Sequence, residues 1–295
     1  MDNSVNPAEG DLRKLQLLEF EILKKVKDIC DRYDITYFLS GGTLLGAVRH
    51  RGFIPWDNDV DVAMPRPDYE RFLKIAEKEL EYPYDVLIPN ESKDYLFPFT
   101  KIIDRRAKVK TSSRKNEQIW YVWADIFPLD SMPKNKLHFT LRKYHILFRR
   151  MMYMYSCFDD MVTINKKNRP MVERIMIRFG SLSHLERFLD TSKQIRKYNQ
   201  CLCRYPFSKG YYIINLMGVY KFKSVMERSI YGKKTEIPFE GVNFRVPEQY
   251  DLYLKRIYND YMSFPPEDQR NLHQIELIPE PLTNLNESTS SEDRI

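Results

Sequence analysis

Three aspartates at alternate positions are the residues of this chain best placed to do chemistry. Asp57, Asp59 and Asp61 lie in the run Trp56-Asp57-Asn58-Asp59-Val60-Asp61-Val62. Side chains two apart on a β-strand project from the same face, so a strand over this run would gather the three carboxylates on one side. Carboxylates this close repel one another, and Mg²⁺ or Mn²⁺ relieves the repulsion when it binds one or two of them together with substrate phosphate oxygens. The run therefore predicts a metal site for phosphate chemistry.

The flanks of this run help to distinguish a functional site from a solvated acidic turn, which is the commoner origin of an isolated Asp-x-Asp. The acids have apolar neighbours, namely Ile54, Pro55, Trp56, Val60, Val62 and Met64. Such neighbours are typical of the edge of a buried strand, here expected over Asp59–Met64, and not of a polar surface loop. The flanks favour a functional site.

A pair of glycines precedes the acids. Residues 36–40 read as a strand that runs into Gly41 and Gly42, and a short helix is expected from Thr43 to Arg49. Glycines let backbone N–H groups approach a phosphate, and the N-terminus of the following helix adds a favourable dipole. A Gly-Gly pair is more often only a turn, so it supports a phosphate site without establishing one.

The elements around these motifs alternate between helix and strand. Apolar residues recur every three or four positions from Asp11 to Asp34, as an amphipathic helix requires. A second helix, with proline at its start, is expected over Pro67–Leu80. Further strands are expected over Asp85–Ile88, Phe99–Lys110 and Gln118–Phe127, before Pro128 and Pro133 interrupt the pattern. The first half of the chain is thus predicted to be mixed α/β.

The second half carries no motif that can be assigned a function. Residues from about Asn135 to Gly218 are rich in Met, Tyr, Lys and Arg and are expected to be helical. The segment His145–Tyr155 is interpreted as a buried helix, with peripheral contact to a membrane as the alternative. We expect one compact body with a catalytic core at 1–131, a helical lobe at 132–238, a C-terminal segment at 239–280 that packs on the core, and a disordered polar tail at 281–295.

Composition excludes several classes of protein. The chain has 295 residues, 43% of them hydrophobic, which is enough for a sizeable core. The net charge, 47 − 41 = +6, suits anionic phosphates or a membrane surface but is too diffuse for a nucleic-acid-binding protein. The four cysteines form no C-x-x-C pair, and no segment reads as a secretory signal or a membrane span. We therefore expect a cytoplasmic protein, or one at the inner face of a membrane.

The segment Gly41–Met64 resembles the signature of the LicD/fukutin-related family, a branch of the nucleotidyltransferase superfamily. The resemblance covers residues 30–131 and 239–273 and implies an α/β (α+β) core with a nucleotidyltransferase-like mixed sheet, to which the helical lobe is added. Family members move phosphocholine from CDP-choline, or a phospho-polyol from its CDP carrier, onto a glycan. The paired metal-binding aspartates of the family fall on Asp59 and Asp61.

The resemblance also implies roles for residues outside the acidic run. Asp125, in Ala124-Asp125-Ile126-Phe127-Pro128, matches a third carboxylate that is a metal ligand or the base for the incoming hydroxyl. The remaining candidates for substrate binding are Gly41, Gly42, Thr43, Arg49, Asp57, Lys101, Trp123, Arg270 and His273. The chain departs from the family pattern at Asn58, where Asp is usual, and at Asn259, where Gly is common. Asn58 is expected on the strand face away from the metal, so the site is expected to be intact.

A choline donor carries a quaternary ammonium, which proteins bind through cation–π contacts with aromatic rings. The aromatic residues near the acids are Trp56, Trp120, Tyr121 and Trp123, and core packing explains them equally well. CDP-ribitol, CDP-glycerol and an ethanolamine donor therefore stay open as alternatives. The acceptor is expected to be a cell-surface glycan or a teichoic-acid precursor, free or lipid-linked, and the helical lobe is the candidate for binding it.

Chemistry consistent with these residues is an in-line displacement. A metal on Asp59 and Asp61 would neutralise the donor diphosphate, an acceptor hydroxyl would displace CMP, and Asp125 would take the proton. One alternative is a nucleotidyltransferase that transfers NMP from an NTP and releases pyrophosphate. The other is a non-catalytic scaffold of glycan biosynthesis, against which the retained cluster of acidic residues argues.

Overall fold

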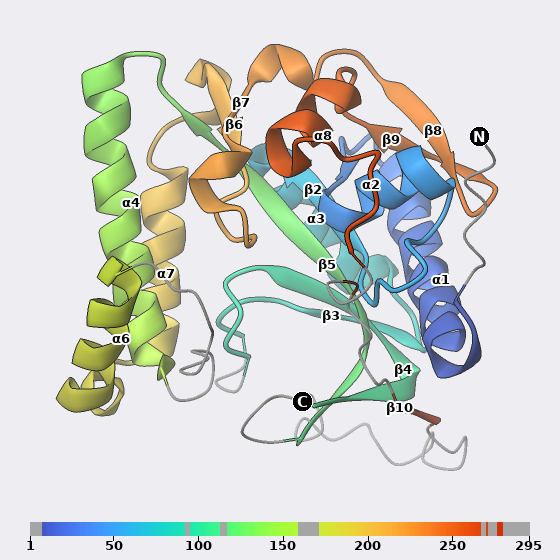
Figure 1. Cartoon of the computed structure of the whole chain (residues 1–295), viewed down its shortest axis with the longest axis horizontal. Helices are drawn as coiled ribbons and strands as arrows, with labels where there is room; N and C mark the ends of the chain where they lie inside the picture. Colours follow the sequence, from blue (N-terminus) through green and yellow to red (C-terminus); the bar gives the residue numbers. More distant parts are fainter. Residues whose placement is uncertain are drawn as a thin grey trace.

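The computed structural model describes residues 8–91, 95–112, 117–158, 171–266, 270 and 276–279. A twisted mixed sheet runs through the centre, with helices α1, α2 and α3 around one end and helices α4, α6 and α7 grouped at the other (Figure 1). The predicted mixed α/β class is confirmed. None of the described helices is long and apolar enough to cross a lipid bilayer.

The sheet is built around one parallel pair of strands, β2 (Asp61–Pro65) and β5 (Glu117–Met132). On the free side of β2 lies antiparallel β1 (Phe38–Leu39), and on the other side of β5 lies antiparallel β4 (Thr100–Ser112). The flanking strands are β3 (Tyr84–Leu87) and β10 (Glu276–Pro279), which pair with β4, and β6 (Tyr212–Ile214) and β7 (Met226–Glu227), which extend the sheet from β5.

The helices of the first half match the sequence pattern closely. Helix α1 (Gly10–Arg32) buries its apolar stripe in the core, as expected for Asp11–Asp34. Helix α3 (Arg66–Glu79) carries Pro67 in its first turn. Helix α2 (Gly41–His50) begins at the glycine pair itself, two residues earlier than predicted.

Two strand predictions need correction. Strand β2 begins at Asp61 and not at Asp59, so Asp57, Asn58 and Asp59 lie in the preceding loop and not on a strand face. Strand β5 continues through Pro128 to Met132. The N–H of Asp125 donates to the carbonyl of Val60, just before β2, so it points to the β2 side of the strand. Because N–H groups alternate in direction along a strand, the nitrogen of Pro128 points to the β4 side. Pairing with β4 ends at Ile126, so the missing N–H of Pro128 costs no ladder bond.

The segment expected to be helical is only partly so. Helices α4 (Lys136–Ser156), α6 (Met171–Ser183) and α7 (Thr191–Cys203) follow the prediction. Residues 212–214 instead form β6, which pairs with Asp130–Met132 at the end of β5. The helical prediction is wrong here because the extension of β5 past its proline supplies a sheet edge that the sequence did not suggest. The predicted boundaries at 131, 238 and 280 stay predictions, and the tail at 281–295 lies outside the described residues.

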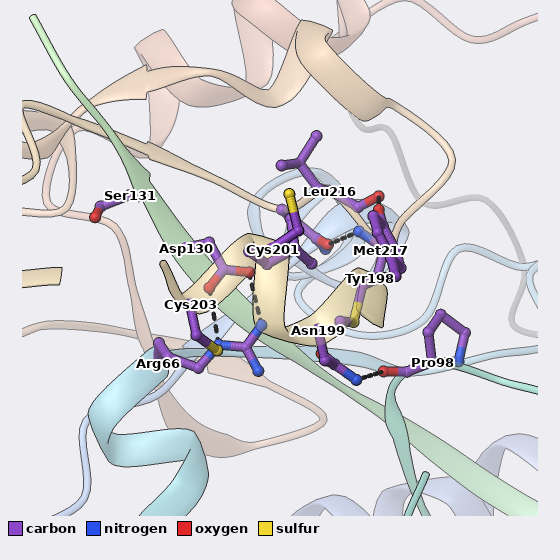
Figure 2. Close-up of polar contacts among 12 residues, drawn as sticks. Arg66, Pro98, Asp130, Ser131, Tyr198, Asn199, Cys201, Cys203, Leu216 and Met217 are labelled. Atoms are coloured by element: carbon purple, nitrogen blue, oxygen red, sulfur yellow. Dashed lines mark hydrogen bonds and ion pairs between the residues drawn. The ribbon is translucent and has the colours of Figure 1, made fainter. Parts of the chain in front are cut away.

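A buried ion pair joins helix α3 to the end of strand β5, next to helix α7. Arg66, at the start of α3, donates from Nε and Nη2 to the two carboxylate oxygens of Asp130 on β5, at 2.8 and 2.7 Å. Figure 2 shows this pair beside Cys203 of α7, and Asn199 of the same helix donating to the carbonyl of Pro98 at 3.4 Å. A bidentate pair fixes direction as well as distance, so this pair sets the orientation of the end of β5 relative to α3.

The C-terminal segment returns to the core. A hairpin of β8 (Thr235–Phe239) and β9 (Val242–Val246) precedes helix α8 (Tyr250–Tyr258), where the Tyr253 hydroxyl lies 3.3 Å from Ser40 Oγ, just before α2. Asn259 ends α8 with a φ of +60° and a ψ of −113°, a conformation that favours glycine, yet its N–H still donates to the carbonyl of Lys255 at 2.9 Å. The departure from the family's glycine therefore leaves the turn in place.

Candidate active site

A cleft of about 640 Å³ opens between the catalytic half and the segment that follows β5. The first half contributes the glycine pair and all four candidate carboxylates, Asp57, Asp59, Asp61 and Asp125. We call this group the acidic side. The segment from α4 to residue 224 contributes Arg150, Tyr153, Met154, Asn215, Met217, Gly218, Val219, Tyr220 and Ser224. We call these residues the second side of the cleft.

Strand register brings three of the charged residues into one row. Asp61 on β2 pairs with Asp125 on β5 in the parallel ladder, and Asp125 pairs with Lys101 on β4 in the antiparallel one. Residues in register on adjacent strands project from the same face of the sheet. The row therefore crosses three strands as Asp61, Asp125 and Lys101, which the sequence could only place separately.

The loop before β2 supplies the other two carboxylates. The N–H of Asp57 donates to the carbonyl of Ile54 at 2.9 Å, and Gln16 of α1 donates from Nε2 to the carbonyl of Asp57 at 2.9 Å. These bonds hold the loop in place against helix α1. Asp57 and Asp59 therefore line the cleft although they are not on a strand. The predicted convergence of the three acids is observed, but a loop held by α1 produces most of it.

The glycine pair is explained by how closely two carboxylates approach it. Gly41 has a φ of +55°, and a Cβ built on it would lie 2.5 Å from Asp61 Oδ2. A Cβ on Gly42 would lie 2.5 Å from Asp57 Oδ2. Thr43, the next residue, is buried, and its Oγ1 accepts a hydrogen bond from the N–H of Asp61 at 2.8 Å. Thr43 therefore fastens α2 to β2, while the two glycines line the cleft at the N-terminus of α2.

Burial raises the pKa values of the acidic loop. Desolvation, with the nearby charge of Asp59, raises the pKa of Asp57 to about 8. Desolvation, with the charge of Asp125, raises that of Asp59 to about 6, and the pKa of Asp61 also lies well above its usual range, mainly through burial. Carboxyl groups held this way are stabilised by a cation, which favours their ionised form.

Asp125 has a different environment because it has its own cation. Its carboxylate forms an ion pair with the Lys101 ammonium, and both side chains are buried. Burial raises the pKa of Asp125, and Lys101 lowers it. The ammonium also lies over the ring of Trp123, 4.5 Å from its centroid, and over that of Phe97 at 4.8 Å. The Lys101 ammonium thus occupies one face of the Trp123 ring. Trp123 is also not among the described residues that line the cleft.

The remaining basic candidates lie behind the cleft. Arg49 donates from Nη1 to the carbonyl of Tyr261 at 2.9 Å and stacks 4.8 Å from the centroid of Phe264. The guanidinium of Arg270 lies 5.0 Å from the ring of Trp56, which does line the cleft. Both arginines are thus placed to hold the C-terminal segment against Trp56. His273 lies outside the described residues.

One buried carboxylate beneath the site was not anticipated. Glu19 of α1 has no exposed surface, and neither of its carboxylate oxygens has a hydrogen-bond partner among the described residues. Desolvation, and then the charge of Asp59, raises its pKa well above the usual range. The sequence contained one indication of this buried carboxylate, because Gln16 and Glu19 are polar residues at positions on the apolar stripe of the helix.

The carboxylates suit a metal that uses few protein ligands. Within the described part of the chain, no three Asp, Glu, His or Cys side chains are arranged to hold one ion by themselves. Mg²⁺ is commonly held by one or two carboxylates, with water and substrate phosphates as the other ligands. Asp59 and Asp61 fit this pattern, because burial leaves them in need of a counter-charge, whereas Asp125 already pairs with Lys101.

We expect the metal-free protein to lose stability as the pH rises from 6.5 to 8. The pKa of Asp57 is raised from 3.8 to about 8, so the folded state holds a proton that the unfolded state has released, and raising the pH favours unfolding. His50, whose pKa burial lowers to about 4, acts in the opposite direction only up to its ordinary value of 6.5. Urea unfolding should show a fall of about 1–2 kcal/mol over this interval. A rise in stability over the same interval would contradict the prediction.

The comparisons with known proteins agree with this site. Residues 34–149, which include α2, β2, β4, β5 and all four aspartates, match the family described as "LicD/FKTN/FKRP, nucleotidyltransferase domain". The fold and the site thus define a transferase with a nucleotidyltransferase domain.

Full-length similarity places the chain within that class. It is 32% identical over 272 residues to the lipopolysaccharide cholinephosphotransferase LicD of Haemophilus influenzae, covering 90% of this chain and 96% of that protein. It is also 43% identical over 44 residues to the human ribitol 5-phosphate transferase FKRP, covering 15% of this chain and 9% of that protein. The chain belongs to the LicD family, which confirms the resemblance in the sequence.

Proposed function

We propose that this protein transfers phosphocholine from CDP-choline to a hydroxyl group of a cell-surface glycan or teichoic-acid precursor and releases CMP. The observation that carries the proposal is the row formed by Asp61, Asp125 and Lys101, of which the two aspartates line the cleft and Lys101 pairs with Asp125. The similarity to a cholinephosphotransferase extends over 90% of the chain, including the segment that forms the second side of the cleft. We place the protein in the cytoplasm or at the inner face of the membrane, where CDP-linked donors are expected.

In the proposed reaction, the acceptor oxygen forms a bond with the phosphorus of the phosphocholine group, and the bond from that phosphorus to the bridging oxygen breaks. CMP leaves with the bridging oxygen, and Asp125 accepts the hydroxyl proton. Mg²⁺ or Mn²⁺, when bound by Asp59 and Asp61, would neutralise charge on the diphosphate. Lys101 favours the ionised form of Asp125 and orients its carboxylate, and the N-terminus of α2 adds a favourable dipole for the phosphates.

Aromatic residues of the cleft support choline as the transferred alcohol. The rings of Tyr220 and Tyr258 both line the cleft and meet nearly at right angles, with centroids 5.4 Å apart and an interplanar angle of 79°. The charge of Asp61 acts on both tyrosines. Two aromatic faces next to a carboxylate are suited to a quaternary ammonium. We infer that this corner, and not Trp123, binds the choline group.

Calorimetry with CDP-choline, CDP-ribitol, CDP-glycerol and CTP in the presence of Mg²⁺ tests the donor. We expect CDP-choline to bind most tightly, and Tyr258→Leu to weaken it about tenfold without affecting CDP-glycerol, because a cation–π contact is worth about 1–2 kcal/mol. Tyr82→Leu, at an exposed tyrosine that does not line the cleft, is the control. Preference for another CDP-polyol would change the transferred group, and binding of CTP alone, with pyrophosphate as the product, would favour a nucleotidyltransferase.

We also propose that α4 and α6 contact an anionic membrane surface. One face of α4 exposes four apolar residues at helical spacing, Leu137, Leu141, Tyr144 and Phe148, which are 49–70% exposed. Helix α6 likewise exposes Met171, Ile175, Phe179 and Leu182. Helix α4 contains five Lys or Arg residues and no Asp or Glu, so its charge complements acidic phospholipids. This arrangement is expected of a transferase that uses a lipid-linked acceptor.

Co-sedimentation with vesicles tests the membrane contact. The protein is expected to bind vesicles containing phosphatidylglycerol and not pure phosphatidylcholine. Leu141→Glu together with Phe148→Glu should abolish binding. Ile119→Glu, at an exposed apolar residue on β5, should leave it unchanged. Equal binding by all three proteins would refute the assignment of this surface.

A further inference from the structure

The second side of the cleft contains one cation. Among the described residues that line the cleft, only Arg150 of α4 is a lysine, an arginine or a histidine. Its Nη1 donates to the carbonyl of Leu216 at 2.5 Å, its side chain also forms a hydrogen bond with Tyr198, and no described carboxylate forms a salt bridge with it. A guanidinium has five N–H donors in a planar fork, so these two bonds still leave donors for a ligand. An unpaired arginine in a cleft is a candidate for binding an oxyanion.

Asn215 adds a second donor beside this arginine. Its Oδ1 accepts hydrogen bonds from the N–H groups of Met217 at 3.1 Å and Gly218 at 3.0 Å, and this fixes the orientation of the carboxamide. The Nδ2 group therefore lies at the other end of the amide, and Asn215 lines the cleft. A Cβ on Gly218 would come within 3.1 Å of Nδ2. The glycine thus leaves the amide uncovered on that side.

The protein holds these two donors in a fixed frame. The carbonyl of Leu216 accepts from the Tyr198 hydroxyl at 3.0 Å as well as from Arg150, and Figure 2 shows Tyr198 reaching Leu216 from α7. Ser224 donates from Oγ to the carbonyl of Asn215 at 2.8 Å. Tyr198 is fully buried and stacks on Tyr153, with an interplanar angle of 3°. The donors are therefore oriented before any ligand arrives, which lowers the entropic cost of binding.

The position of this pair distinguishes it from the donor site. The donor diphosphate is assigned to the acidic side, with Asp59, Asp61 and the N-terminus of α2. Lys101 is the cation that acts on Asp125, and Arg49 acts on Asp57, whereas Arg150 belongs to the segment beyond β5. A substrate that approaches Asp125 from the second side meets Arg150 and Asn215, and the acceptor has to reach Asp125 for its hydroxyl proton to be accepted.

We propose that Arg150 and Asn215 form a subsite for an oxyanion of the acceptor, so that the acceptor carries a phosphate group close to the hydroxyl that is modified. This inference rests on the proposed function, because it places the donor on the acidic side. It goes further by naming the chemical class of the acceptor, a phosphorylated glycan in preference to a neutral one. The planar fork of arginine matches two phosphate oxygens, and the Asn215 amide reaches a third.

Calorimetry without a donor tests the subsite directly. The probes are a hexosamine 6-phosphate and the same hexosamine without phosphate. The wild-type protein is expected to bind the phosphorylated sugar more tightly, and Arg150→Met should weaken that binding roughly tenfold to a hundredfold, since a hydrogen bond to a charged group is worth about 1.5–3 kcal/mol. Arg149→Met, the neighbouring residue on α4, is the matched control. Equal binding of the two sugars would overturn the proposal.

Asn215→Asp provides a second variant that keeps the turn. Aspartate retains an oxygen to accept from Met217 and Gly218, but it loses the donor and adds a negative charge. We expect its affinity for the phosphorylated sugar to fall at least as far as that of Arg150→Met, with an unchanged melting temperature. If it bound the phosphorylated sugar as tightly as the wild type, the amide would have no part in the site.

Steady-state kinetics separates acceptor binding from donor binding. With CDP-choline, Arg150→Met should raise KM for the phosphorylated acceptor by the same factor and change KM for the donor less than twofold. A rise confined to the donor KM would assign Arg150 to the donor phosphate and overturn the proposal. Failure of the wild type to use CDP-choline would count against the proposed function alone, because the donor-free binding result would still stand.

Discussion

Replacing Asp61 by Asn is expected to abolish transfer and, at the same time, to make the metal-free protein more stable. The side chain is buried, and both desolvation and the neighbouring charge of Asp59 raise its pKa, so its ionised form is unfavourable in the fold. A neutral amide of nearly the same shape removes that repulsion. Without the carboxylate, the charge neutralisation proposed for the donor diphosphate is lost, which is worth several kcal/mol in the transition state. Activity should therefore fall about a thousandfold or more.

Two measurements on the same variant check this prediction. Thermal unfolding without divalent cations should show a melting temperature about 2–4 °C higher than that of the wild type, as expected for a gain of about 1 kcal/mol in a chain of this size. Added Mg²⁺ should then raise the melting temperature of the wild type more than that of the variant. Asp28→Asn, at an exposed position of α1 next to Arg32, is the control. A variant that is less stable, or that transfers normally, would remove Asp61 from the metal site.

The opposite changes expected for Asp61→Asn, lower activity and higher stability, agree with the way in which the protein holds the acidic loop. Gln16 donates to the carbonyl of Asp57, and glycines stand where any side chain would collide with Asp57 and Asp61. These features keep carboxylates close together at a cost to the fold, and the cost is useful only if a cation and a phosphate are bound. Functional sites commonly carry such locally unfavourable arrangements.

The sequence predicted the acidic side better than the second side for a physical reason. Asp59, Asp61 and Asp125 lie in or next to strands, and alternation with apolar residues marks a strand that is half buried. The contacts of Arg150 and Asn215 depend on the path of residues 204–224 over α7, which is set by tertiary packing and by strand β6. No local periodicity encodes that path, so these residues were not among the candidates.

Trp123 shows how strand register adds to an argument from sequence position. Its position two residues before Asp125 suggested a ring for the substrate ammonium, but the antiparallel register pairs Trp123 with Ile103 and places the Lys101 ammonium over its ring. Because the Lys101 ammonium lies over this ring, we place the substrate ammonium at Tyr220 and Tyr258 instead. Tyr220 and Tyr258 were available in the sequence, but 38 residues separate them, and only the fold makes them neighbours.

Replacing Lys101 by Met is expected to reduce transfer about a hundredfold or more and to shift its pH dependence. The ammonium lowers the pKa of Asp125 against the effect of burial, so its loss lets that pKa rise. A larger fraction of Asp125 is then protonated at a given pH, and the protonated form cannot accept a proton from the acceptor hydroxyl. General-base catalysis is commonly worth about a hundredfold to ten-thousandfold. The acidic limb of the pH–rate profile should therefore move to higher pH, and raising the pH should recover part of the activity.

The shift in the pH–rate profile distinguishes two roles for Lys101. In one role it lowers the pKa of the base Asp125, and in the other it binds the donor phosphate. If Lys101 acted mainly by contacting the donor phosphate, Lys101→Met would raise KM for the donor and leave the acidic limb in place. Lys108→Met is the matched control, because Lys108 lies on the same strand β4 but is only partly buried and outside the row of charged residues. Methionine keeps the apolar contact with Trp123 and Phe97, so folding should be preserved. An unchanged pH profile would assign the proton to a group other than Asp125.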